Sequence, residues 1–514
     1  MNKRFLLAMV LSLFVLIGWS ALVSKFYHVE NKGVTENIAE NIPDTSISSV
    51  VSPPVVTQPI KANPLALTTI STENIDLTFN TDSATITQAT FNQYQDHVLL
   101  LGDGFLIASV PNGFKQIGSL DNNKIEFRSR NERFEIIKTF KVDSGKYVLD
   151  FEVSIKNVAG ISLQERLALT VGDLDFSGDQ SEAQFKSASF FASERAVYPN
   201  VRKDIALDDV RFASLRDRYF CAIVETKEDG VIGMIKKIDN NRSRVGLEVK
   251  EIMFAPGEVK NYSFRIYLGP QDLQVINRVN PQWTVVMHYG VLNVIAHLLI
   301  QILHWLYSLV HNWGLAIILF SFIIYVIMLP LSIQQMKSMK SMQLLQPKVE
   351  EVRKLYKDNP QKQNKEIMEL YKEHKINPLG GCLPMVLQIP VFFALYQVMM
   401  RSVALKGANF LWIKDLSLPD RLFVFKGNFN IPFLGNEVNI LPILMAIGMF
   451  VQQKTSMAAS AASKEAAQQQ KIMLIMFPLI FGVIFYRMPS GLVMYWFVNS
   501  TLTLINQIRI ARAK

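Results

Sequence analysis

Cysteine and intramembrane charge are scarce in this sequence. Its 514 residues include two cysteines, Cys221 and Cys382. The topology argued below places them in different compartments, so no disulfide is expected and each is interpreted as a small buried apolar residue. Residues 279–336 contain no Asp, Glu, Lys or Arg, and the apolar stretches after residue 285 contain no Asp or Glu. That absence argues against proton- or cation-coupled transport, which usually needs an intramembrane carboxylate.

Residue patterns that carry chemistry are also missing. The sequence has no paired carboxylates, nucleophile elbow, phosphate loop or Cys/His cluster, so we expect no enzyme activity and no cofactor. His297, His304 and His311 repeat every seven residues, but seven residues span ~10 Å of helix, too far to share one ion. No metal site is predicted.

The chain is rich in hydrophobic residues and unevenly charged. It is 49% hydrophobic with net charge +9. Residues 25–278 carry 29 basic and 34 acidic side chains, a net of −5, and the rest is +14. The positive charge lies beside apolar runs, which is typical of cytoplasmic loops of membrane proteins. No basic recognition helix accompanies it, so sequence-specific nucleic-acid binding is not expected.

Six membrane spans are predicted, with both termini in the cytoplasm. Phe5 to Val23 is an uncharged run of 19 residues after Lys3 and Arg4; we favour an uncleaved anchor over a cleaved signal peptide, since no convincing small-x-small site follows. The 58 uncharged residues 279–336 would make a helix of ~87 Å, too long for one crossing. Their first part is interpreted as an interfacial amphipathic helix and their second part as a span. Charge-free runs that follow give four more spans, two of them short.

Two soluble regions are expected. Residues from about Leu65 to Pro270 show short alternating runs such as Tyr147–Ile155, separated by turn signals such as Asp229-Gly230; this predicts a β-sandwich outside the membrane. Residues 332–376 are interpreted as a helical hairpin broken at Asp358-Asn-Pro360. Its basic residues form either a merely solvated face or a docking surface, for which the candidates are Lys348, Arg353, Lys354 and Lys357.

Polar side chains recur inside the expected spans. Ser321 and Tyr325 lie four residues apart, and Gln388 and Tyr396 share the next span. The last span carries Asn499 and Thr503, with Asn506, on one helical face. Each could simply hydrogen-bond to a neighbouring helix; together they favour a hydrophilic recess inside the bundle.

The interpretation as a hydrophilic recess is supported by an unusual run of residues, Asn377-Pro-Leu-Gly-Gly-Cys-Leu-Pro384 followed by Gln388-Ile-Pro390. It places three prolines and two glycines within 14 residues, and such breaks survive in lipid only where protein or a water-lined cavity satisfies the freed backbone groups.

These motifs resemble the YidC family of membrane protein insertases, within the wider group of Oxa and Albino proteins. The resemblance covers most of residues 305–508 and includes Asn312-Trp-Gly314, Pro330-Leu331, Leu345-Gln-Pro-Lys348, Asn377 to Pro384, Gln388-Ile-Pro390, Ala394-Leu-Tyr396, Leu441-Pro-Ile-Leu444 and Pro489-Ser-Gly-Leu492. The anchor and large β domain resemble the Gram-negative type, whose exported domain is a β-supersandwich.

The resemblance implies an insertase and chaperone of the bacterial inner membrane. Its substrates would be nascent membrane proteins and lipoproteins. Its partners would be the Sec translocon and, on the cytoplasmic side, the ribosome and signal-recognition targeting factors. It would also contact membrane lipids. A groove open to cytoplasm and lipid would receive the substrate, with Gln388 and Trp496 carried over by motif. The family usually has an arginine five residues before Pro330, where this chain has Tyr325. The groove would therefore rely there on neutral hydrogen bonding.

The predicted fold class is a six-helix membrane bundle, five helices of which form the shared core, plus a periplasmic β-supersandwich and a cytoplasmic helical hairpin. The expected segments are an anchor at 1–24, a linker at 25–64, the β domain at 65–278, an interfacial helix at 283–306, spans at 309–331, 381–401, 438–456, 471–487 and 489–508, the hairpin at 332–376, a periplasmic loop at 402–437, a cytoplasmic loop at 457–470 and a short tail at 509–514. Alternatives are a polytopic solute or peptide transporter, which would need a closed site and usually internal repeats, and an anchored exported carbohydrate-active enzyme, which would depend on the β domain alone.

Overall fold

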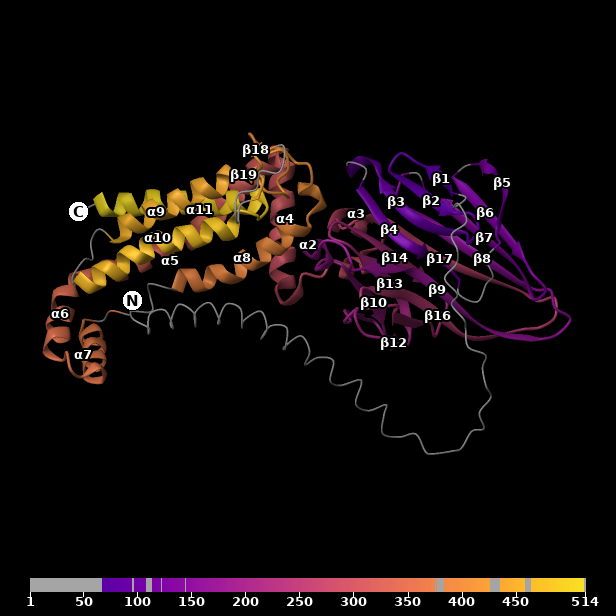
Figure 1. Cartoon of the computed structure of the whole chain (residues 1–514), viewed down its shortest axis with the longest axis horizontal. Helices are drawn as coiled ribbons and strands as arrows, with labels where there is room; N and C mark the ends of the chain where they lie inside the picture. The colour runs from indigo at the N-terminus through magenta and orange to yellow at the C-terminus, as the bar shows by residue number, and fades with distance from the viewer. Residues whose placement is uncertain are drawn as a thin grey trace, which may run out of the picture. The chain divides into compact units, whose positions relative to one another are not determined.

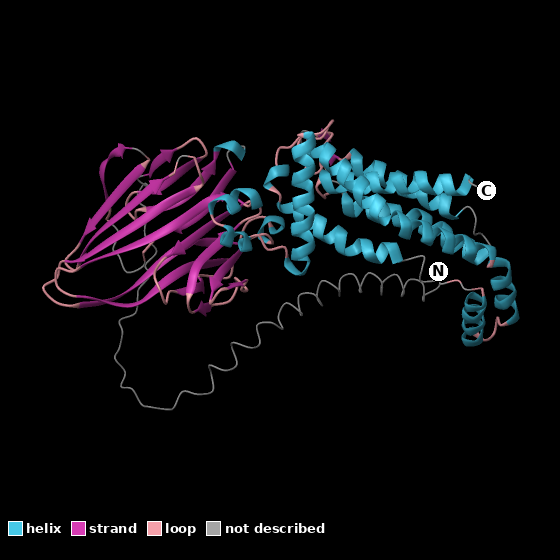
Figure 2. Cartoon of the chain, turned by 180° about the vertical axis from the view of Figure 1, so that it is seen from behind, coloured by secondary structure: helices cyan, strands magenta, loops and turns pink. Residues whose placement is uncertain are grey.

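A computed structural model describes residues 67–512 apart from 95–96, 108–112, 122, 144, 375, 377–382, 426–434 and 458–463. The expected anchor at 1–24, the linker at 25–64 and the Gly380-Gly-Cys382 run lie outside the described residues. In the described part, the three large sheets end at Pro270 and the long helices begin at Asn293 (Figure 1). Figure 2 shows the same division by secondary structure.

Three antiparallel sheets form the β domain. The first has the order β1-β2-β3-β4, with strands Leu67–Ser71, Ile75–Asn80, Thr85–Phe91 and His97–Gly104. The second has the order β11-β10-β13-β14-β17-β8-β7-β6-β5, and in chain order its strands are β5 Lys115–Asp121, β6 Lys124–Arg130, β7 Phe134–Val142, β8 Val148–Asn157, β10 Ser187–Ala192, β11 Arg195–Val197, β13 Val210–Arg216, β14 Phe220–Thr226 and β17 Val259–Pro270. The third has the order β12-β15-β16-β9, with β9 Leu163–Asp175, β12 Ile205–Leu207, β15 Ile232–Lys237 and β16 Arg242–Phe254.

The nine-stranded sheet packs against the other two, which makes a sandwich. Phe79 of β2 contacts Phe127 and Phe140 of the large sheet, with ring centroids 5.8 and 5.1 Å away. Strand β13 packs on β9, β15 and β16 of the third sheet. An isolated β-bridge joins Ile107, three residues after β4, to Leu169 of β9 in the third sheet. The predicted β-sandwich is therefore confirmed. Burial alternates along strands such as β7, as expected where one face of a sheet packs on the core.

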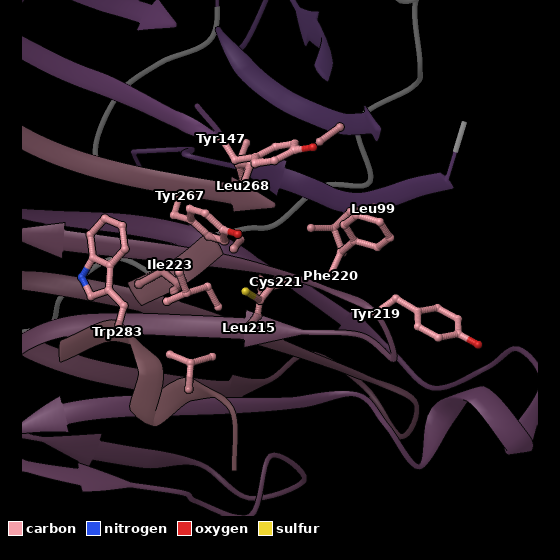
Figure 3. Packing of buried hydrophobic residues seen from close by; sticks show 14 of the residues in the cluster. Leu99, Tyr147, Leu215, Tyr219, Phe220, Cys221, Ile223, Tyr267, Leu268 and Trp283 are labelled. Carbon is pink, nitrogen blue, oxygen red and sulfur yellow. The ribbon is translucent and has the colours of Figure 1, made fainter. Parts of the chain in front are cut away.

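Large aromatic side chains fill one end of the sandwich core. Tyr267 lies between Tyr147 and Trp283, with ring centroids 6.4 and 6.0 Å apart (Figure 3). Trp283 follows the last strand, in the 3-10 helix η2 (Pro281–Val286), after the short helix α3 (Leu273–Val279). Cys221 in β14 is completely buried in this core, as predicted. The segment after β17, which contains α3 and η2, therefore packs against the core of the sandwich.

One lysine lies inside the sandwich. Lys138 occupies an inward position of β7, between Ile136 and Phe140, and is completely buried. Its ammonium donates to the backbone carbonyls of Ser83, Ala84 and Phe105 at 3.1–3.3 Å. Ala84 and Phe105 both have positive φ angles, so the lysine satisfies carbonyls in two irregular turns of the first sheet. Burial lowers the pKa of Lys138 to about 7.

The helical part contains eight long helices in its described residues. They are α4 Asn293–Val310, α5 Trp313–Leu344, α6 Gln346–Leu355, α7 Pro360–Glu373, α8 Leu383–Arg401, α9 Ile440–Met457, α10 Lys464–Phe485 and α11 Ser490–Arg512. The remaining short elements of the described residues are η1 Asn92–Tyr94, α2 Gln180–Ala183, η3 Gly290–Leu292, η5 Val403–Leu405, β18 Phe423–Val424 and β19 Glu437–Val438. Helix α5 packs on α4, α8 and α11, and α9 packs on α10 and α11.

Two described helical segments are long and apolar enough to cross a membrane, Gly290–Val310 and Trp313–Met342, while Ile440–Thr455 and Leu474–Phe485 are apolar but shorter. Helix bounds differ from the predicted segments: α10 begins at Lys464, inside the predicted loop at 457–470, and α11 ends at Arg512, inside the predicted tail. Two differences are larger. The interfacial helix expected over 283–306 is regular α-helix only from Asn293, because residues 281–286 form a 3-10 helix that packs into the β domain. Helix α5 continues through Pro330 to Leu344, so the predicted span and the start of the predicted hairpin are one helix.

Candidate functional site

A polar contact joins two of the long apolar helices. The side-chain amide of Gln388 in α8 donates a hydrogen bond to the hydroxyl of Tyr495 in α11. Tyr495 is fully buried, and its ring lies 5.9 Å from that of Phe320 in α5. Three helices therefore meet at Tyr495. This residue was missed in the sequence because Tyr495 stands in an apolar run, and only the fold brings it to Gln388.

Trp496, the neighbouring residue, belongs to an aromatic cluster. Its ring lies 5.3 Å from Phe392 of α8 and 6.1 and 5.5 Å from Phe481 and Phe485 of α10. The indole is only partly buried. Trp496 therefore ties α11 to α8 and α10 on the side next to the Gln388–Tyr495 contact.

Two predicted groove residues are involved in helix packing. Ser321 is fully buried, and its hydroxyl donates to the carbonyl oxygen of Ile317 one turn earlier in α5. Such a bond satisfies the hydroxyl within its own helix. Tyr396 of α8 is half-buried and packs against the apolar core. The structure therefore brings Gln388 and Trp496 to the same junction, whereas Ser321 faces closely packed neighbours.

Helix α11 carries a line of polar side chains beyond Tyr495. The Thr503 hydroxyl donates to the carbonyl oxygen of Asn499 in the same helix. The side-chain nitrogens of Asn499 and Asn506 are buried and have no hydrogen-bond partner among the described residues. An unpaired buried amide is unfavourable by about 1–3 kcal/mol. The two side-chain nitrogens lie on one helix face, so this face presents two hydrogen-bond donors without an acceptor among the described residues.

Tyr325 is half-buried on α5, which packs along α11. Helix α5 itself has no charged side chain from Trp313 to Met336. No lysine or arginine close to Tyr325 in the sequence replaces the family arginine.

The basic candidates of the predicted hairpin lie on α6 and just after it. Lys348, Arg353, Lys354 and Lys357 are all exposed. The Lys348 ammonium lies 3.2 Å from His374 at the end of α7, and the Gln363 amide of α7 donates to the carbonyl oxygen of Arg353. These contacts hold α6 and α7 together and leave the other cationic side chains available.

No group of three or more His, Cys, Asp or Glu in the described part of the chain is arranged to hold a metal ion. His297 hydrogen-bonds to the carbonyl oxygen of Met287, and His304 packs edge-on against Trp313, with ring centroids 5.2 Å apart. The two histidines therefore have separate structural partners.

Comparisons with known proteins decide the family. Residues 110–302 match the model of the YidC periplasmic domain, and residues 305–514 match that of the 60Kd inner membrane protein. A membrane protein insertase YidC of Syntrophobacter fumaroxidans is 35% identical over 391 residues, which covers 74% of this chain and 69% of that protein. This chain belongs to the YidC family.

A second curated relative agrees with this assignment. The membrane protein insertase YidC of Cupriavidus necator is 33% identical over 78% of this chain and 70% of its own length. A solved YidC insertase with its first transmembrane domain resolved is 20% identical, covers 88% of this chain and 95% of its own chain, and has a TM-score of 0.39. YidC proteins are bacterial inner-membrane insertases with a periplasmic domain. The second and third sheets of the β-sandwich lie within that domain's match, whereas β1–β4 precede it.

Proposed function

We propose that this chain inserts nascent membrane proteins into the bacterial inner membrane and helps them fold, through a polar recess bordered by α5, α8 and α11. The observation that supports it most directly is the pair of side-chain nitrogens of Asn499 and Asn506, which are buried on a membrane helix without a hydrogen-bond partner among the described residues. Gln388, Tyr325 and Trp496 line the neighbouring surfaces in this proposal, and Tyr396 and Thr503 lie at its edges. The protein acts by binding and is not an enzyme.

The recess lowers the free energy of moving a short hydrophilic segment into the membrane. Such a segment loses water when it enters hydrocarbon, and each unsatisfied polar group there is unfavourable by several kcal/mol. Amide and hydroxyl groups in the recess replace part of that water. Partition of the client's apolar helix then supplies the driving force, ~25 cal/mol for each Å² of apolar surface removed from water.

The proposed topology has six spans with both termini in the cytoplasm. Five spans correspond to α5 and α8–α11, and the sixth is the anchor expected at 1–24. The helices Ile440–Thr455 and Leu474–Phe485 are shorter than a full crossing, and short spans favour a thinner bilayer around them. In this topology the β domain is periplasmic, α4 lies at the outer interface and the α6–α7 hairpin is cytoplasmic.

Partners follow from that arrangement. Exposed Lys348, Arg353, Lys354 and Lys357 would dock ribosomes, signal-recognition targeting factors or anionic lipid headgroups on the cytoplasmic side. Larger clients, and lipoproteins, would be handled together with the Sec translocon. No cofactor is needed, because the free energy comes from partition of the client.

Photocrosslinking tests the recess. A photoreactive residue at Gln388, Tyr325 or Trp496 should crosslink to a stalled nascent membrane protein. Matched controls are Ile447 of α9 and Leu479 of α10, which are 55% and 57% exposed on apolar helix faces and should crosslink to lipid instead. Equal client crosslinking from all five positions would contradict a defined recess.

Depletion and deletion test the function itself. Depletion should leave short, weakly charged membrane proteins uninserted, and normal insertion would contradict the proposal. Removal of residues 65–270 should preserve most insertase activity, because the recess helices lie outside that range. Loss of all activity upon this deletion would favour a function located in the β domain.

A further inference from the structure

Helix α4 has three different faces. Its buried face carries Leu299 and Leu303, which are 4% and 3% exposed, and the helix packs on α5 and α8. At 100° per residue, the polar side chains of Gln301, His304 and Ser308 form a strip beside this buried face. On the other side of the strip lie apolar side chains that are 57–82% exposed, namely Val294, Leu298, Trp305 and Leu309. A polar strip that borders an exposed apolar face is typical of a helix at a membrane surface.

The polar strip of α4 lines a cavity of about 300 Å³, and α3 forms the other wall. The lining residues are Leu273 and Gln274 of α3 and Gln301, His304, Trp305 and Ser308 of α4. Trp305 therefore belongs both to the cavity and to the exposed apolar face. Tryptophan is enriched at the headgroup level of a bilayer, where its ring meets both apolar and polar surroundings.

The cavity offers hydrogen-bonding groups that the protein itself does not use. The side-chain amides of Gln274 and Gln301 and the ring nitrogens of His304 form no hydrogen bond with other described residues. None of the described lining residues is Asp or Glu. Donor groups without a carboxylate among them suit a ligand that is rich in oxygen acceptors, such as a phosphate.

A cation lies beside the cavity. Arg278 is four residues after Gln274 on α3, so the two side chains are neighbours on the same side of that helix. Arg278 is exposed, and it forms no ion pair with a carboxylate among the described residues. Its long side chain can therefore reach the opening of the cavity and supply positive charge there. Guanidinium groups are well suited to phosphate oxygens.

We infer that the cavity between α3 and α4 binds the phosphate headgroup of a glycerophospholipid from the outer leaflet. The phosphate oxygens accept hydrogen bonds from Gln301, His304 and Arg278, and the acyl chains lie along Leu298 and Leu309 on the exposed apolar face of α4. A free phosphate makes the polar contacts alone, whereas the lipid also removes apolar surface from water. The inference depends on the proposed position of α4 at the outer interface and is independent of client binding in the recess.

Native mass spectrometry of the full-length protein in a neutral detergent tests the inference. The probe is dioleoylphosphatidylglycerol, with two matched compounds: dioleoylglycerol, which lacks the phosphate, and glycerol 3-phosphate, which lacks the acyl chains. The wild-type protein should retain one phosphatidylglycerol after the detergent has removed weakly bound lipid. Dioleoylglycerol should be retained about tenfold less, because a hydrogen bond to a charged group corresponds to about a tenfold change in an equilibrium. Excess glycerol 3-phosphate should not displace the lipid.

Variants of the cavity separate binding from folding. Arg278→Gln and Gln301→Leu should each lower phosphatidylglycerol retention about tenfold. Both residues are exposed, so both variants should unfold at the wild-type temperature when no lipid is present. His304→Phe keeps an aromatic ring against Trp313 and should also lower retention. Arg211→Gln is the matched control, because Arg211 is an exposed cation of β13, and it should leave retention unchanged.

Four outcomes would overturn the inference. Wild-type retention in an Arg278→Gln, Gln301→Leu double variant would exclude the cavity as the site. Equal retention of dioleoylglycerol would show that apolar contact alone holds the lipid, and displacement by glycerol 3-phosphate would indicate a site for soluble phosphates. An equal loss in Arg211→Gln would indicate general surface charge. These measurements use no client protein, so failure of the lipid site leaves the proposed function standing, and failed client insertion with the lipid retained would contradict that function alone.

Discussion

The Gln388 amide donates a hydrogen bond to the Tyr495 hydroxyl between α8 and α11, and the rings of Phe392 and Trp496 pack between the same two helices. In a membrane interior such a bond is worth about 1 kcal/mol or less, because the unfolded chain also finds partners in the bilayer. In the proposed function it lies at the inner end of the recess, and Tyr495→Phe removes the hydroxyl without removing the ring.

We expect Tyr495→Phe to lower thermal stability slightly while the ring contact with Phe320 remains. Gln388→Leu should have a similar effect, and the double variant should be no worse than either single one, because both remove the same bond. Thermal unfolding in detergent micelles measures all three. Strictly additive losses would show that the two side chains do not stabilise the structure through each other.

Lys138 should make β-domain stability depend on pH. Its pKa is about 7 in the folded state and near 10.4 in an unfolded chain. Above pH 7 the folded state releases this proton while the unfolded state keeps it, so stability should rise with pH by about 1 kcal/mol per unit from pH 7 to pH 9. Below pH 7 both states are protonated, so the unfavourable burial of the charge is present in full.

The measurement is alkylation of the buried Cys221 thiol in urea, in a Cys382→Ser background, with rates scaled to those of the unfolded chain at each pH. Lys138→Met should abolish the pH-dependent gain. Lys141→Met is the matched control, because Lys141 lies in the same strand but is exposed; it should keep the slope. An unchanged slope in Lys138→Met would rule out the buried ammonium as its source.

Asp420 stabilises the start of a helix that begins 20 residues later. Its Oδ2 accepts from the backbone N–H groups of Ile440 and Leu441 at 2.9 and 3.0 Å, and from the indole of Trp412 at 3.2 Å. We expect Asp420→Ala to destabilise the protein by about 1–2 kcal/mol, since helix N-termini lose that much without an acceptor. Asp420→Asn, which keeps one acceptor, should lose less.

Thermal unfolding of the full-length protein checks this order. Lys414→Ala changes an exposed residue of the same loop and should lie within about 0.5 kcal/mol of wild type. If Asn and Ala at position 420 behaved alike, the carboxylate-to-backbone bonds would not be the stabilising contact.

Gly314 leaves room for an aromatic ring from a distant loop. A Cβ atom at this position would lie 2.1 Å from Cγ of Phe410, far inside contact distance. Gly314→Ala should therefore destabilise the protein by about 1–3 kcal/mol through overpacking. In a Phe410→Ala background, the same change should cause a much smaller further loss.

The control is Gly448→Ala in α9, where an added Cβ meets nothing within 4 Å. It should be neutral or slightly stabilising, because alanine is the better helix former. A comparable loss of stability at positions 314 and 448 would argue that backbone freedom, rather than the Phe410 ring, explains the glycine.

Local patterns were sufficient to predict much of the fold. The alternating run Tyr147–Ile155 corresponds to β8, and Asp358-Asn-Pro360 separates α6 from α7. Long apolar runs correspond to α5 and α8–α11. These features depend on residues close in sequence, where hydrophobic period, proline and glycine carry the information.

The rest depends on contacts between distant residues. No local pattern shows that Tyr495 meets Gln388 or that Asp420 stabilises the start of α9. Lys138 alternates correctly to face inward, yet a lysine in a strand is normally interpreted as solvent-facing, and its three carbonyl acceptors come from turns 33–55 residues earlier. Gly314 belongs to one of the motifs, but the Phe410 ring that leaves no room for a side chain there lies 96 residues later in the sequence.

Helix α5 has a mechanical consequence. Its 32 residues form a single rod ~48 Å long, with Pro330 as the interior position that lacks a backbone N–H. A displacement or rotation of the helix at Leu344 must therefore either move Tyr325 as well or bend the helix near Pro330. If the recess has the proposed position, a partner bound to α6 and α7 changes its geometry through α5 without touching it.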